Sequence, residues 1–352
     1  MKKNLLHIVF ALLLITTSCH KENSGVVTVA NTKGVYIINQ GNFGFGNADI
    51  SFYNPDSVLG ANNPVNGLFK GVNGYSLGDV AQSMYIKDSL GYIVMNNSQR
   101  INVVKIPSFK NVLTISLLHA YPRYFLPIND SIAYVTELYQ GEIHVINYRT
   151  GALVTQITGV AEWTEQMVMN GNNVVVEEQN FDDTTFGSLA VINATTNTFM
   201  QRYKYPGGNI NGMVKDAQGH IWLALDEDST ALIPASLCCL NSDMSINKVL
   251  VFSLGHHPNN LCIDGTGSQL YFFDTDIYTV ATSSNSVPTT AFSSVNGQNF
   301  YALGVDPVKG DVYAADALDY VQPSRIYRYS SSGGLIQSFA AGVITGNFTF
   351  NE

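Results

Sequence analysis

A strand pattern that recurs along the whole chain is the feature that most constrains how it can fold. Each repeat carries an apolar strand, a polar turn, a second strand often centred on tyrosine, and a third strand that ends near asparagine or another turn residue. The second strand recurs at residues 35–37, 91–94, 133–135, 174–176, 221–223, 270–272 and 312–314. This spacing is roughly 40 to 56 residues, and four-stranded propeller blades repeat at about 40 to 50 residues. The pattern therefore predicts an all-β protein over residues 34–352, a seven-bladed β-propeller of four-stranded blades.

The two ends of the chain complete each other in this pattern. The innermost strand of each repeat precedes the tyrosine strand, but the first repeat has room only for residues 26–29 before it. The last residues, 346–350, read as an inner strand without a blade of its own. A C-terminal strand that completes the N-terminal blade would close the ring and remove exposed strand edges. Six or eight blades are the alternative if one weak repeat is misread.

The composition agrees with short strands joined by polar turns. Charged residues make up only 13% of the chain, which holds 19 tyrosines, 18 phenylalanines, 30 glycines and 34 asparagines. Aromatic residues favour strands, and asparagine and glycine favour turns. The formal net charge is −9, or −11 once the lysines at positions 2 and 3 are removed. An acidic surface repels phosphate, so binding to nucleic acid is disfavoured.

The first residues have the features of an export signal. A basic start, an apolar stretch at residues 5–15 and small residues up to 18 lead to Cys19. The stretch is shorter than the ~20 apolar residues that cross a bilayer, so it predicts a cleaved lipoprotein signal peptide at residues 1–18. Cys19 resembles the lipid-modified cysteine of a lipobox, although Thr16 stands where leucine is usual. We expect residues 19–33 to form a lipidated tether that holds the protein at the outer membrane, facing the cell surface and touching the membrane only through the lipid. An ordinary secreted protein is the alternative.

No motif for catalysis or metal binding stands out, so neither a cofactor nor a metal is predicted. A GxSxG nucleophile motif is absent, and His256-His257 lies in a turn without the helical spacing of a metal-binding pair. The acidic groups at 182–183 and 226–228 could offer oxygen ligands to Ca²⁺, but neither follows the EF-hand pattern, which favours solvated loop charge. The three cysteines left after lipidation cannot form a disulfide framework and read as core residues: Cys238, Cys239 and Cys262.

The predicted register places two groups of loops on one rim of the central channel: those before each inner strand and those between second and third strands. Aromatic, amide and arginine side chains gather in these loops. Because a rigid ring would point them at one axis, we expect ligand contacts from the following residues: Phe43, Gln82, Tyr121, Arg123, Tyr124, Trp163, Gln166, Asn211, Asn260, Phe300, Tyr301 and Tyr320.

Two of these residues allow two interpretations. Arg123 lies between two tyrosines and could bind a phosphate or carboxylate with two hydrogen bonds, or stack on a ring. It could instead pair with Glu165 or Asp79 between blades. Trp163 is either a binding platform on the rim or packing between blades, whereas Trp222, inside a strand, is expected in the core.

Local sequence motifs also resemble those of a known family. The chain resembles the YncE-like cell-surface propeller lipoproteins of Gram-negative bacteria at these motifs: NQGNFG at 39–44, LGDVAQSM at 77–84, PRY at 122–124, EQM at 165–167, YALGVDP at 301–307, ADALDYVQ at 315–322 and YRY at 327–329. The likeness spans about residues 34–350. Near the end, Thr-Gly-Asn stands where the family often has Pro-Gly-Ala, a departure that bears on ring closure.

The family includes BtuG-type proteins, so the resemblance implies capture of cobamides, the vitamin B12 group, and transfer to a TonB-dependent transporter. An aromatic and amide-rich rim can meet both the flat face and the amide-bearing edge of a corrin ring. We therefore expect a non-enzymatic protein that captures a small-molecule nutrient, foremost a corrinoid. Two other classes stay open: a structural or adhesive protein that binds proteins or glycans, and an enzyme of the quinoprotein-like or lyase propeller type. A pocket lined by Arg123, Trp163 and Tyr301 favours capture, a flat wide rim favours adhesion, and a buried cluster of histidines and carboxylates favours an enzyme.

Overall fold

The computed structural model describes residues 33–57, 64–179 and 186–352. Within these residues the chain forms 26 strands and one short helix, α1 (Leu68–Asn73), so the predicted all-β class is confirmed. The expected signal peptide, the lipidation site Cys19, nearly all of the expected tether and the acidic pair 182–183 lie outside the described residues. No helix in the described part of the chain is long and apolar enough to span a bilayer.

The strands pair antiparallel in several sheets, most of which use strands that follow one another along the chain. The first sheet, in the order β2-β1-β26, contains β1 (Gly34–Asn39), β2 (Asp49–Tyr53) and β26 (Thr345–Asn351). The next contains β3 (Ala81–Lys87), β4 (Leu90–Met95), β5 (Arg100–Lys105) and β6 (Lys110–Ser116). The largest contains β7 (Tyr121–Pro127), β8 (Ile132–Leu138), β9 (Glu142–Asn147), β10 (Ala152–Thr158), β11 (Trp163–Asn170), β12 (Asn173–Gln179), β13 (Phe186–Asn193) and β14 (Thr198–Pro206).

The remaining strands form three further sheets. One contains β15 (Ile210–Lys215), β16 (Ile221–Leu225), β17 (Ser236–Leu240) and β18 (Ile246–Val251). One contains β19 (Asn259–Ile263), β20 (Gln269–Phe273) and β21 (Ile277–Ala281). One contains β22 (Phe300–Val305), β23 (Val312–Asp316), β24 (Pro323–Tyr329) and β25 (Leu335–Val343).

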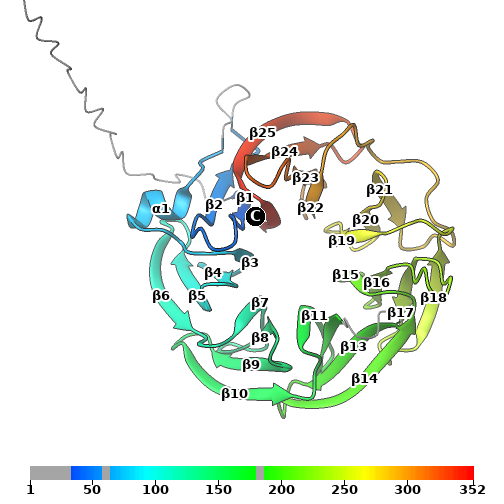
Figure 1. The fold of residues 1–352 in the computed structure, drawn as a ribbon, viewed down its shortest axis with the longest axis horizontal. Helices are drawn as coiled ribbons and strands as arrows, with labels where there is room; N and C mark the ends of the chain where they lie inside the picture. Colours follow the sequence, from blue (N-terminus) through cyan, green and yellow to red (C-terminus); the bar gives the residue numbers. More distant parts are fainter. Residues whose placement is uncertain (1–32, 58–63, 180–185) are drawn as a thin grey trace, which may run out of the picture.

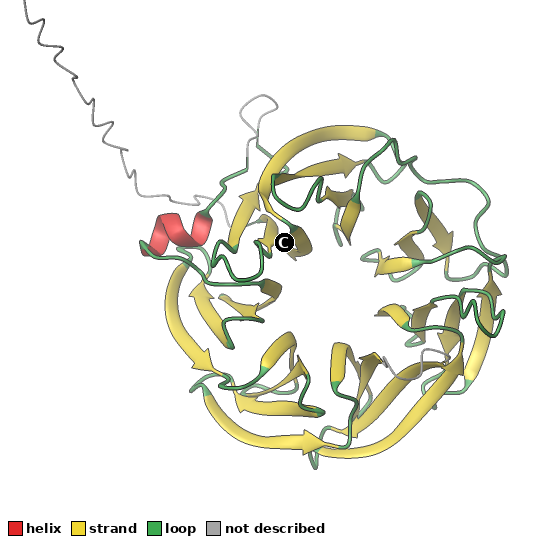
Figure 2. Ribbon diagram, in the orientation of Figure 1, coloured by secondary structure: helices red, strands yellow, loops and turns green. Residues whose placement is uncertain are grey.

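The sheets stand around a common axis, which gives the molecule a propeller-like form (Figure 1, Figure 2). Within the largest sheet, only the pair Leu138 and Trp163 joins β8 to β11, so this sheet divides into two four-stranded units. Each inner strand contacts the inner strands on both sides of it, as β7 contacts β3 and β11. This arrangement brings the beginnings of the inner strands together around the axis.

Among the residues that the structure describes, two sheets have three strands in place of the four predicted for every blade. Single bridges between Phe52 and Val65 and between Ile277 and Ser293 stand where a fourth strand would pair. Pro64 precedes one of these bridges and Pro288 lies shortly before the other. Proline lacks the N–H that a strand ladder requires and is confined to the edges of sheets.

The C-terminal strand pairs with a strand near the start of the described chain. β26 runs antiparallel to β1, with Phe350 opposite Val35 and Phe348 opposite Ile37. Figure 1 marks the C-terminus beside β1. The last strand of the chain thus forms the innermost strand of its first sheet.

Hydrophobic side chains fill the space between neighbouring sheets. Tyr92 stacks on Phe125 of the next sheet with ring centroids 4.6 Å apart, and Trp222 is fully buried, as predicted. The thiol-bearing residues Cys238 and Cys239 are also buried, whereas Cys262 is half-buried. These contacts fix each sheet against its neighbours and hold the inner strands in place.

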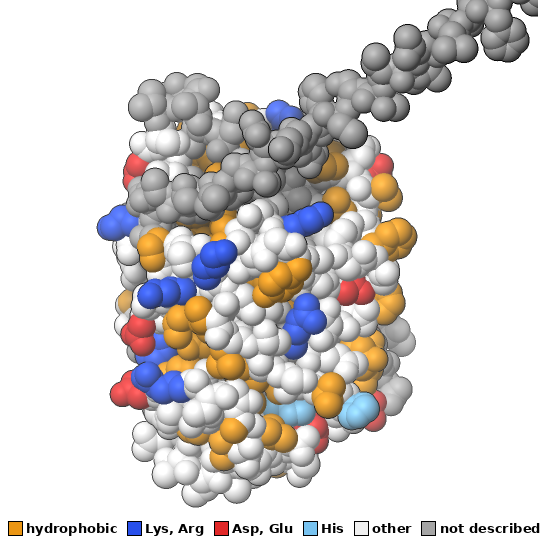
Figure 3. All heavy atoms as spheres, turned by 90° about the vertical axis from the view of Figure 1, so that its left-hand side faces the viewer, with side chains coloured by type: hydrophobic (Ala, Val, Ile, Leu, Met, Phe, Trp, Pro, Cys, Tyr) orange, Lys and Arg blue, Asp and Glu red, His pale blue; other side chains and the backbone are white. Residues whose placement is uncertain are grey.

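The outer wall of the ring has a mixed surface. On the side drawn in Figure 3, lysine and arginine side chains are interspersed with acidic and hydrophobic ones. Single exposed hydrophobic residues on the outer strands, such as Val112 and Leu153, are normal for a soluble surface. Neither charged nor hydrophobic side chains dominate this side of the wall.

Candidate ligand-binding site

Two adjoining cavities lie on the axis between the inner strands. The first, here called the rim cavity, has a volume of about 320 Å³ and is lined by Arg123, Tyr124, Trp163, Glu165, Gln166, Glu177, Gln179, Ile210, Asn211, Gly212, Asn259 and Asn260. The second, here called the axial cavity, has a volume of about 280 Å³ and is lined by Ser83, Met84, Tyr85, Tyr124, Phe125, Leu126, Gln166, Met167, Met213 and Asn347. Tyr124 and Gln166 line both, so the two cavities follow one another along the inner strands.

A β-bulge near the start of each inner strand supplies most of the polar lining. In β7 the pairing with β8 passes from Pro122 to Phe125, which leaves Arg123 and Tyr124 outside the regular ladder. The same irregularity leaves out the following residues in the other inner strands: Gln82, Glu165, Gln166, Asn211, Gly212, Asn260, Leu261, Tyr301 and Gly346. Bulges bend a strand and re-aim side chains. The repeated bulge therefore turns a ring of polar side chains toward the axis.

Arg123 is held in place by two neighbouring inner strands. Its Nε donates to Glu165 Oε1 at 2.8 Å, its Nη2 lies 2.6 Å from the same oxygen, and its Nη1 donates to Gln82 Oε1 at 2.5 Å. The Trp163 ring lies 5.6 Å from the guanidinium carbon, and the indole N–H also donates to Glu165. Burial alone would lower the pKa of Arg123, but the Glu165 carboxylate outweighs it and the net shift is upward. The interpretation that Arg123 pairs with Glu165 is confirmed.

Glu177 brings a second acidic group to the rim cavity. It lies near the end of β12 and is only 3% exposed. Its Oε1 accepts a hydrogen bond from Gln179 Nε2 at 2.7 Å, whereas Oε2 is buried without a hydrogen-bond partner in the described part of the chain. Burial raises the pKa of Glu177 well above its ordinary value of 4.5, and the charge of Glu165 raises it further. The cavity therefore holds two carboxyl groups: that of Glu165, which pairs with Arg123, and that of Glu177, which holds its proton more tightly than an exposed glutamate does.

Amide side chains complete the lining and are partly fixed by the backbone. Gln166 Oε1 accepts from the backbone N–H of Met213 at 2.9 Å, and Gln179 Nε2 also donates to the carbonyl of Ile210 at 2.5 Å. Asn211 reaches the carbonyl of Pro258 at 3.5 Å. These bonds leave further amide atoms of Gln166 and Asn211 to face the cavity that both residues line. The site can thus offer neutral donors and acceptors from several strands at once.

The structure brings half of the predicted ligand contacts together in one cavity. Those that line the rim cavity are Arg123, Tyr124, Trp163, Gln166, Asn211 and Asn260. Gln82 lies behind them as a partner of Arg123. Trp163 lines the cavity, and its ring also faces the Arg123 guanidinium of the neighbouring inner strand β7. Its position therefore agrees both with a place on the rim and with packing between blades.

Three predicted aromatic residues form a separate group on the same rim, here called the aromatic edge: Phe43, Tyr301 and Tyr320. The rings of Tyr301 and Tyr320 meet edge to face at 5.7 Å, and the loop of Phe43 reaches them through Asn42, which donates to the carbonyl of Tyr320 at 2.6 Å. Phe43 is 72% exposed. The aromatic edge is a surface next to the site, since none of its residues is part of the rim cavity lining.

Two predicted contacts fall elsewhere. Phe300 stacks on Phe273 at 5.3 Å and meets Tyr327 at 5.7 Å, so it packs between strands and lines neither cavity, and its contact with a ligand stays a prediction. Tyr301 follows Phe300 at the bulge of β22, outside the regular ladder, and its ring meets Tyr320 instead. Tyr121 packs edge to face against Tyr139 at 5.3 Å and lines neither the rim cavity nor the axial cavity.

Sequence reasoning missed Glu177, Gln179 and Asn259 as lining residues. The available signal was the run Glu177-Glu178-Gln179, three polar residues directly after an apolar strand. Glu178 faces the other way, where Arg202 pairs with it at 2.6 Å and Ser188 donates to it. Which of the two glutamates faces the axis depends on strand register, and the sequence pattern leaves that register open.

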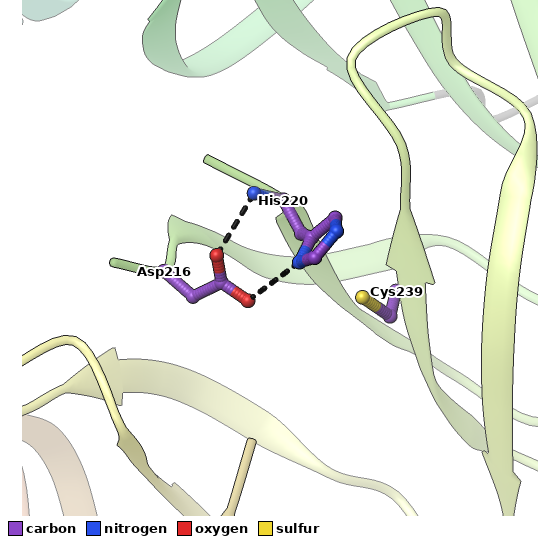
Figure 4. A group of neighbouring side chains, drawn as sticks. All are labelled: Asp216, His220 and Cys239. Carbon is purple, nitrogen blue, oxygen red and sulfur yellow. Dashed lines mark hydrogen bonds and ion pairs between the residues drawn. The ribbon is translucent and has the colours of Figure 1, made fainter. Parts of the chain in front are cut away.

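A cluster of possible metal ligands lies away from this site. Ligand atoms of Asp216, His220 and Cys239 come within 4.8 Å of one another (Figure 4). Asp216 Oδ2 already accepts from Trp222 Nε1 at 3.0 Å and lies 3.1 Å from His220 Nδ1, and its Oδ1 accepts two backbone N–H groups of the turn. Burial raises the pKa of the Cys239 thiol to about 11, so a metal would bind its sulfur only by displacing a tightly held proton. The hydrogen bonds of the turn therefore account for this cluster without a metal.

The side chains of the paired histidines on the rim contact acidic residues. His257 Nδ1 lies 2.8 Å from Asp226 Oδ1, and His256 bonds Asp274. The bond to Asp226 raises the pKa of His257. These pairs agree with the interpretation of His256-His257 as polar contacts on the rim.

Together these features define an all-β, propeller-like protein with a polar cavity on its axis. Over residues 33–342 the chain matches the family described as a domain of unknown function, DUF5074, and it belongs to that family. No curated protein sequence matches it. The YncE-like and BtuG-type resemblance is not among these findings and stays a prediction.

Two solved structures are similar in fold. One is a quinoprotein alcohol dehydrogenase-like protein from Bacteroides thetaiotaomicron, with a TM-score of 0.70, 13% identity, and coverage of 91% of this chain and 79% of that one. The other is hydrazine synthase from Kuenenia stuttgartiensis, with a TM-score of 0.60, 11% identity, and coverage of 91% of this chain and 99% of that one. At such identities the likeness concerns the fold alone.

Proposed function

We propose that this protein is a non-enzymatic surface lipoprotein that captures a small-molecule nutrient, foremost a corrinoid, in its rim cavity. The observation that carries the proposal is the composition of that cavity, which combines amides, the Trp163 and Tyr124 rings and one compensated ion pair. Ligand sites are typically concave, with a few placed polar groups among apolar ones. An Arg123 guanidinium fixed by Glu165 and Gln82 gives a preorganised wall, which lowers the entropy lost on binding.

The ring that positions this cavity is proposed to have seven blades. Seven inner strands support the count, since each contacts the next around the axis: β3, β7, β11, β15, β19, β22 and β26. The pairing of β26 with β1 supports closure of the ring by the C-terminal strand. A closed ring would keep the bulges of all inner strands at fixed distances from one another.

The size of the rim cavity suggests how a corrinoid would sit. Ligand pockets usually measure about 300–1,000 Å³, so a cavity of about 320 Å³ is at the small end and would admit an arm of a corrinoid but not the whole molecule. The corrin ring would then lie above the rim, where the exposed side chains of Phe43 and Tyr320 offer apolar faces.

The anchor and the transfer step are proposed from the N-terminal sequence and the family resemblance. Lipid on Cys19 would hold the protein at the outer membrane, where it would pass its ligand to a TonB-dependent transporter. Replacing Cys19 with alanine tests the anchor: the wild-type protein should incorporate labelled palmitate and fractionate with the outer membrane, and the variant should do neither. Membrane association of the unlabelled variant would contradict lipid anchoring.

Calorimetry tests the capture proposal. A lipid-free protein beginning at Ser24 is titrated with cyanocobalamin and with cobinamide. We expect binding to both, an at least tenfold loss of affinity in Arg123→Ala and in Trp163→Ala, and unchanged affinity in Arg149→Ala, whose arginine lies at an exposed turn. No binding of either corrinoid to a folded protein would contradict a corrinoid ligand.

A further inference from the structure

Glu177 has a buried carboxyl oxygen that the described protein leaves without a partner. The residue is 3% exposed and lines the rim cavity, and its Oε2 has no hydrogen bond in the part of the chain that the structure describes. A buried polar atom without a partner destabilises a protein, so such atoms call for an explanation. A ligand group that enters the cavity would supply the missing partner.

The charges around Glu177 favour its neutral form. Burial is the main reason why the pKa of Glu177 is raised, and the Glu165 charge acts in the same direction. Arg123 opposes the shift, but its guanidinium already bonds Glu165 and Gln82. The hydrogen bond from Gln179 also opposes the shift without overcoming burial. The cavity thus carries a carboxyl group whose protonated form is favoured by its burial, and in that form it can donate one hydrogen bond and accept another.

A primary amide is the chemical complement of such a group. Its N–H donates to the acid carbonyl while its own carbonyl accepts from the acid O–H, so two hydrogen bonds form side by side. The other described lining residues are neutral apart from the ion pair of Arg123 and Glu165, whose charges compensate. An anionic ligand would meet no unpaired cation among them, and a cationic ligand would have to remove the proton of Glu177.

Building on the capture function proposed above, we propose that Glu177 serves as a neutral carboxylic acid that pairs with a primary amide arm of the ligand. The rim cavity would then select uncharged, amide-bearing ligands over carboxylates of the same shape. For a corrinoid this assigns the cavity to one of the acetamide or propionamide arms at the ring edge.

The test compares the pH dependence of binding in three proteins. Calorimetry with cobinamide from pH 6 to pH 10 should give a wild-type affinity that is constant at the acidic end and then falls about tenfold per pH unit once Glu177 ionises. Glu177→Gln keeps a neutral amide in place, so its affinity should stay within about threefold of wild type at pH 6 and lose this pH dependence. Glu177→Ala should bind at least tenfold more weakly. A wild-type affinity that rises with pH, or a Glu177→Ala variant that binds like wild type, overturns the inference.

A matched ligand pair tests the selectivity. Cobinamide and derivatives in which one amide arm is hydrolysed to a carboxylate are titrated into wild type at pH 7. One hydrolysed isomer should bind at least tenfold more weakly than cobinamide, and this difference should shrink in Glu177→Ala. Equal affinities for cobinamide and every isomer overturn the amide pairing while leaving corrinoid capture in place.

A measurement without ligand separates failure of this inference from failure of the capture proposal. Infrared spectra of the ligand-free protein at pH 7 should show a carbonyl band of a protonated carboxylic acid that disappears in Glu177→Gln. Glu137→Gln serves as the matched control, because the carboxyl of Glu137 is also buried and should give a separate band. If cobinamide fails to bind while the Glu177 band is present, corrinoid capture fails alone. If the Glu177 band is missing, the inference fails whatever the ligand.

Discussion

Arg123 Nη2 lies 2.6 Å from Glu165 Oε1, and this ion pair joins the bulges of two neighbouring inner strands, β7 and β11. Both side chains are mostly buried, at 18% and 10% exposure. The pair therefore has a structural role, holding the two strands in register, as well as a place in the lining of the rim cavity.

Removal of Glu165 alone should destabilise the protein, and the losses from removing Glu165 and Arg123 should not add. Glu165→Ala leaves the Arg123 charge buried without its partner, so we expect a loss of about 3 kcal/mol in the free energy of unfolding. In the double variant Arg123→Ala, Glu165→Ala the loss should be smaller than the sum of the two single losses. Urea unfolding of all four proteins measures this coupling. Additive losses would show that the pair contributes no interaction energy.

Burial of Glu137 should make stability depend on pH. Burial raises the pKa of Glu137 to about 8, while the unfolded chain ionises near 4.5. The folded state therefore holds this proton more tightly, so the stability contributed by Glu137 is complete below about pH 4.5 and is lost as the pH rises to about 8. Glu137→Gln removes the titration, and thermal unfolding should show a smaller loss of stability between pH 5 and pH 9, by on the order of 3 kcal/mol. An unchanged pH profile in Glu137→Gln would contradict this assignment.

The C-terminal strand should be essential to the stability of the first sheet. Phe348 lies in β26, is buried among residues that include Val35 and Tyr313, and faces two sheets at once. Phe348→Ala should reduce the free energy of unfolding by about 3–5 kcal/mol. Val308→Ala is the control, since Val308 is 70% exposed and its loss should change stability by less than about 0.5 kcal/mol. Similar values for both variants would show that β26 packs only loosely.

One glycine marks a close approach between neighbouring sheets. A Cβ at Gly265 would lie 1.7 Å from the backbone oxygen of Pro307, which cannot move without shifting its turn. Gly265→Ala should therefore destabilise the protein by about 2 kcal/mol or more. At Gly334 the nearest atom to an added Cβ is the Ser330 hydroxyl at 3.4 Å, so Gly334→Ala should have a small effect. Equal melting temperatures for the two variants would contradict this packing.

Much of the architecture could be predicted because it depends on local pattern. Alternating apolar strands and turn residues predicted the strand positions, and loops before the inner strands predicted Arg123, Gln166 and Asn211 near one another. The pairing of Arg123 was one of two predicted interpretations, and choosing between them required the distance to Glu165.

The remaining features depend on register, which the pattern does not specify. A bulge shifts side chains by one position, so it decides that Tyr301 turns away from the sheet interior while Phe300 packs within it. The same uncertainty applies to Glu177 and Glu178, which face opposite sides of β12. The Glu177 oxygen, which has no hydrogen-bond partner among the described residues, could therefore be found only once both faces of that strand were known.

A crystal structure of the complex with cobinamide would show whether the ligand binds in the rim cavity. We expect a corrin ring over the rim, with one amide arm in the rim cavity and its amide within hydrogen-bonding distance of the Glu177 carboxyl. Repeating the experiment with Trp163→Ala should give an empty or poorly occupied site. A ligand bound on the outer wall, or a rim cavity that stays empty at saturating cobinamide, would contradict ligand capture at this site.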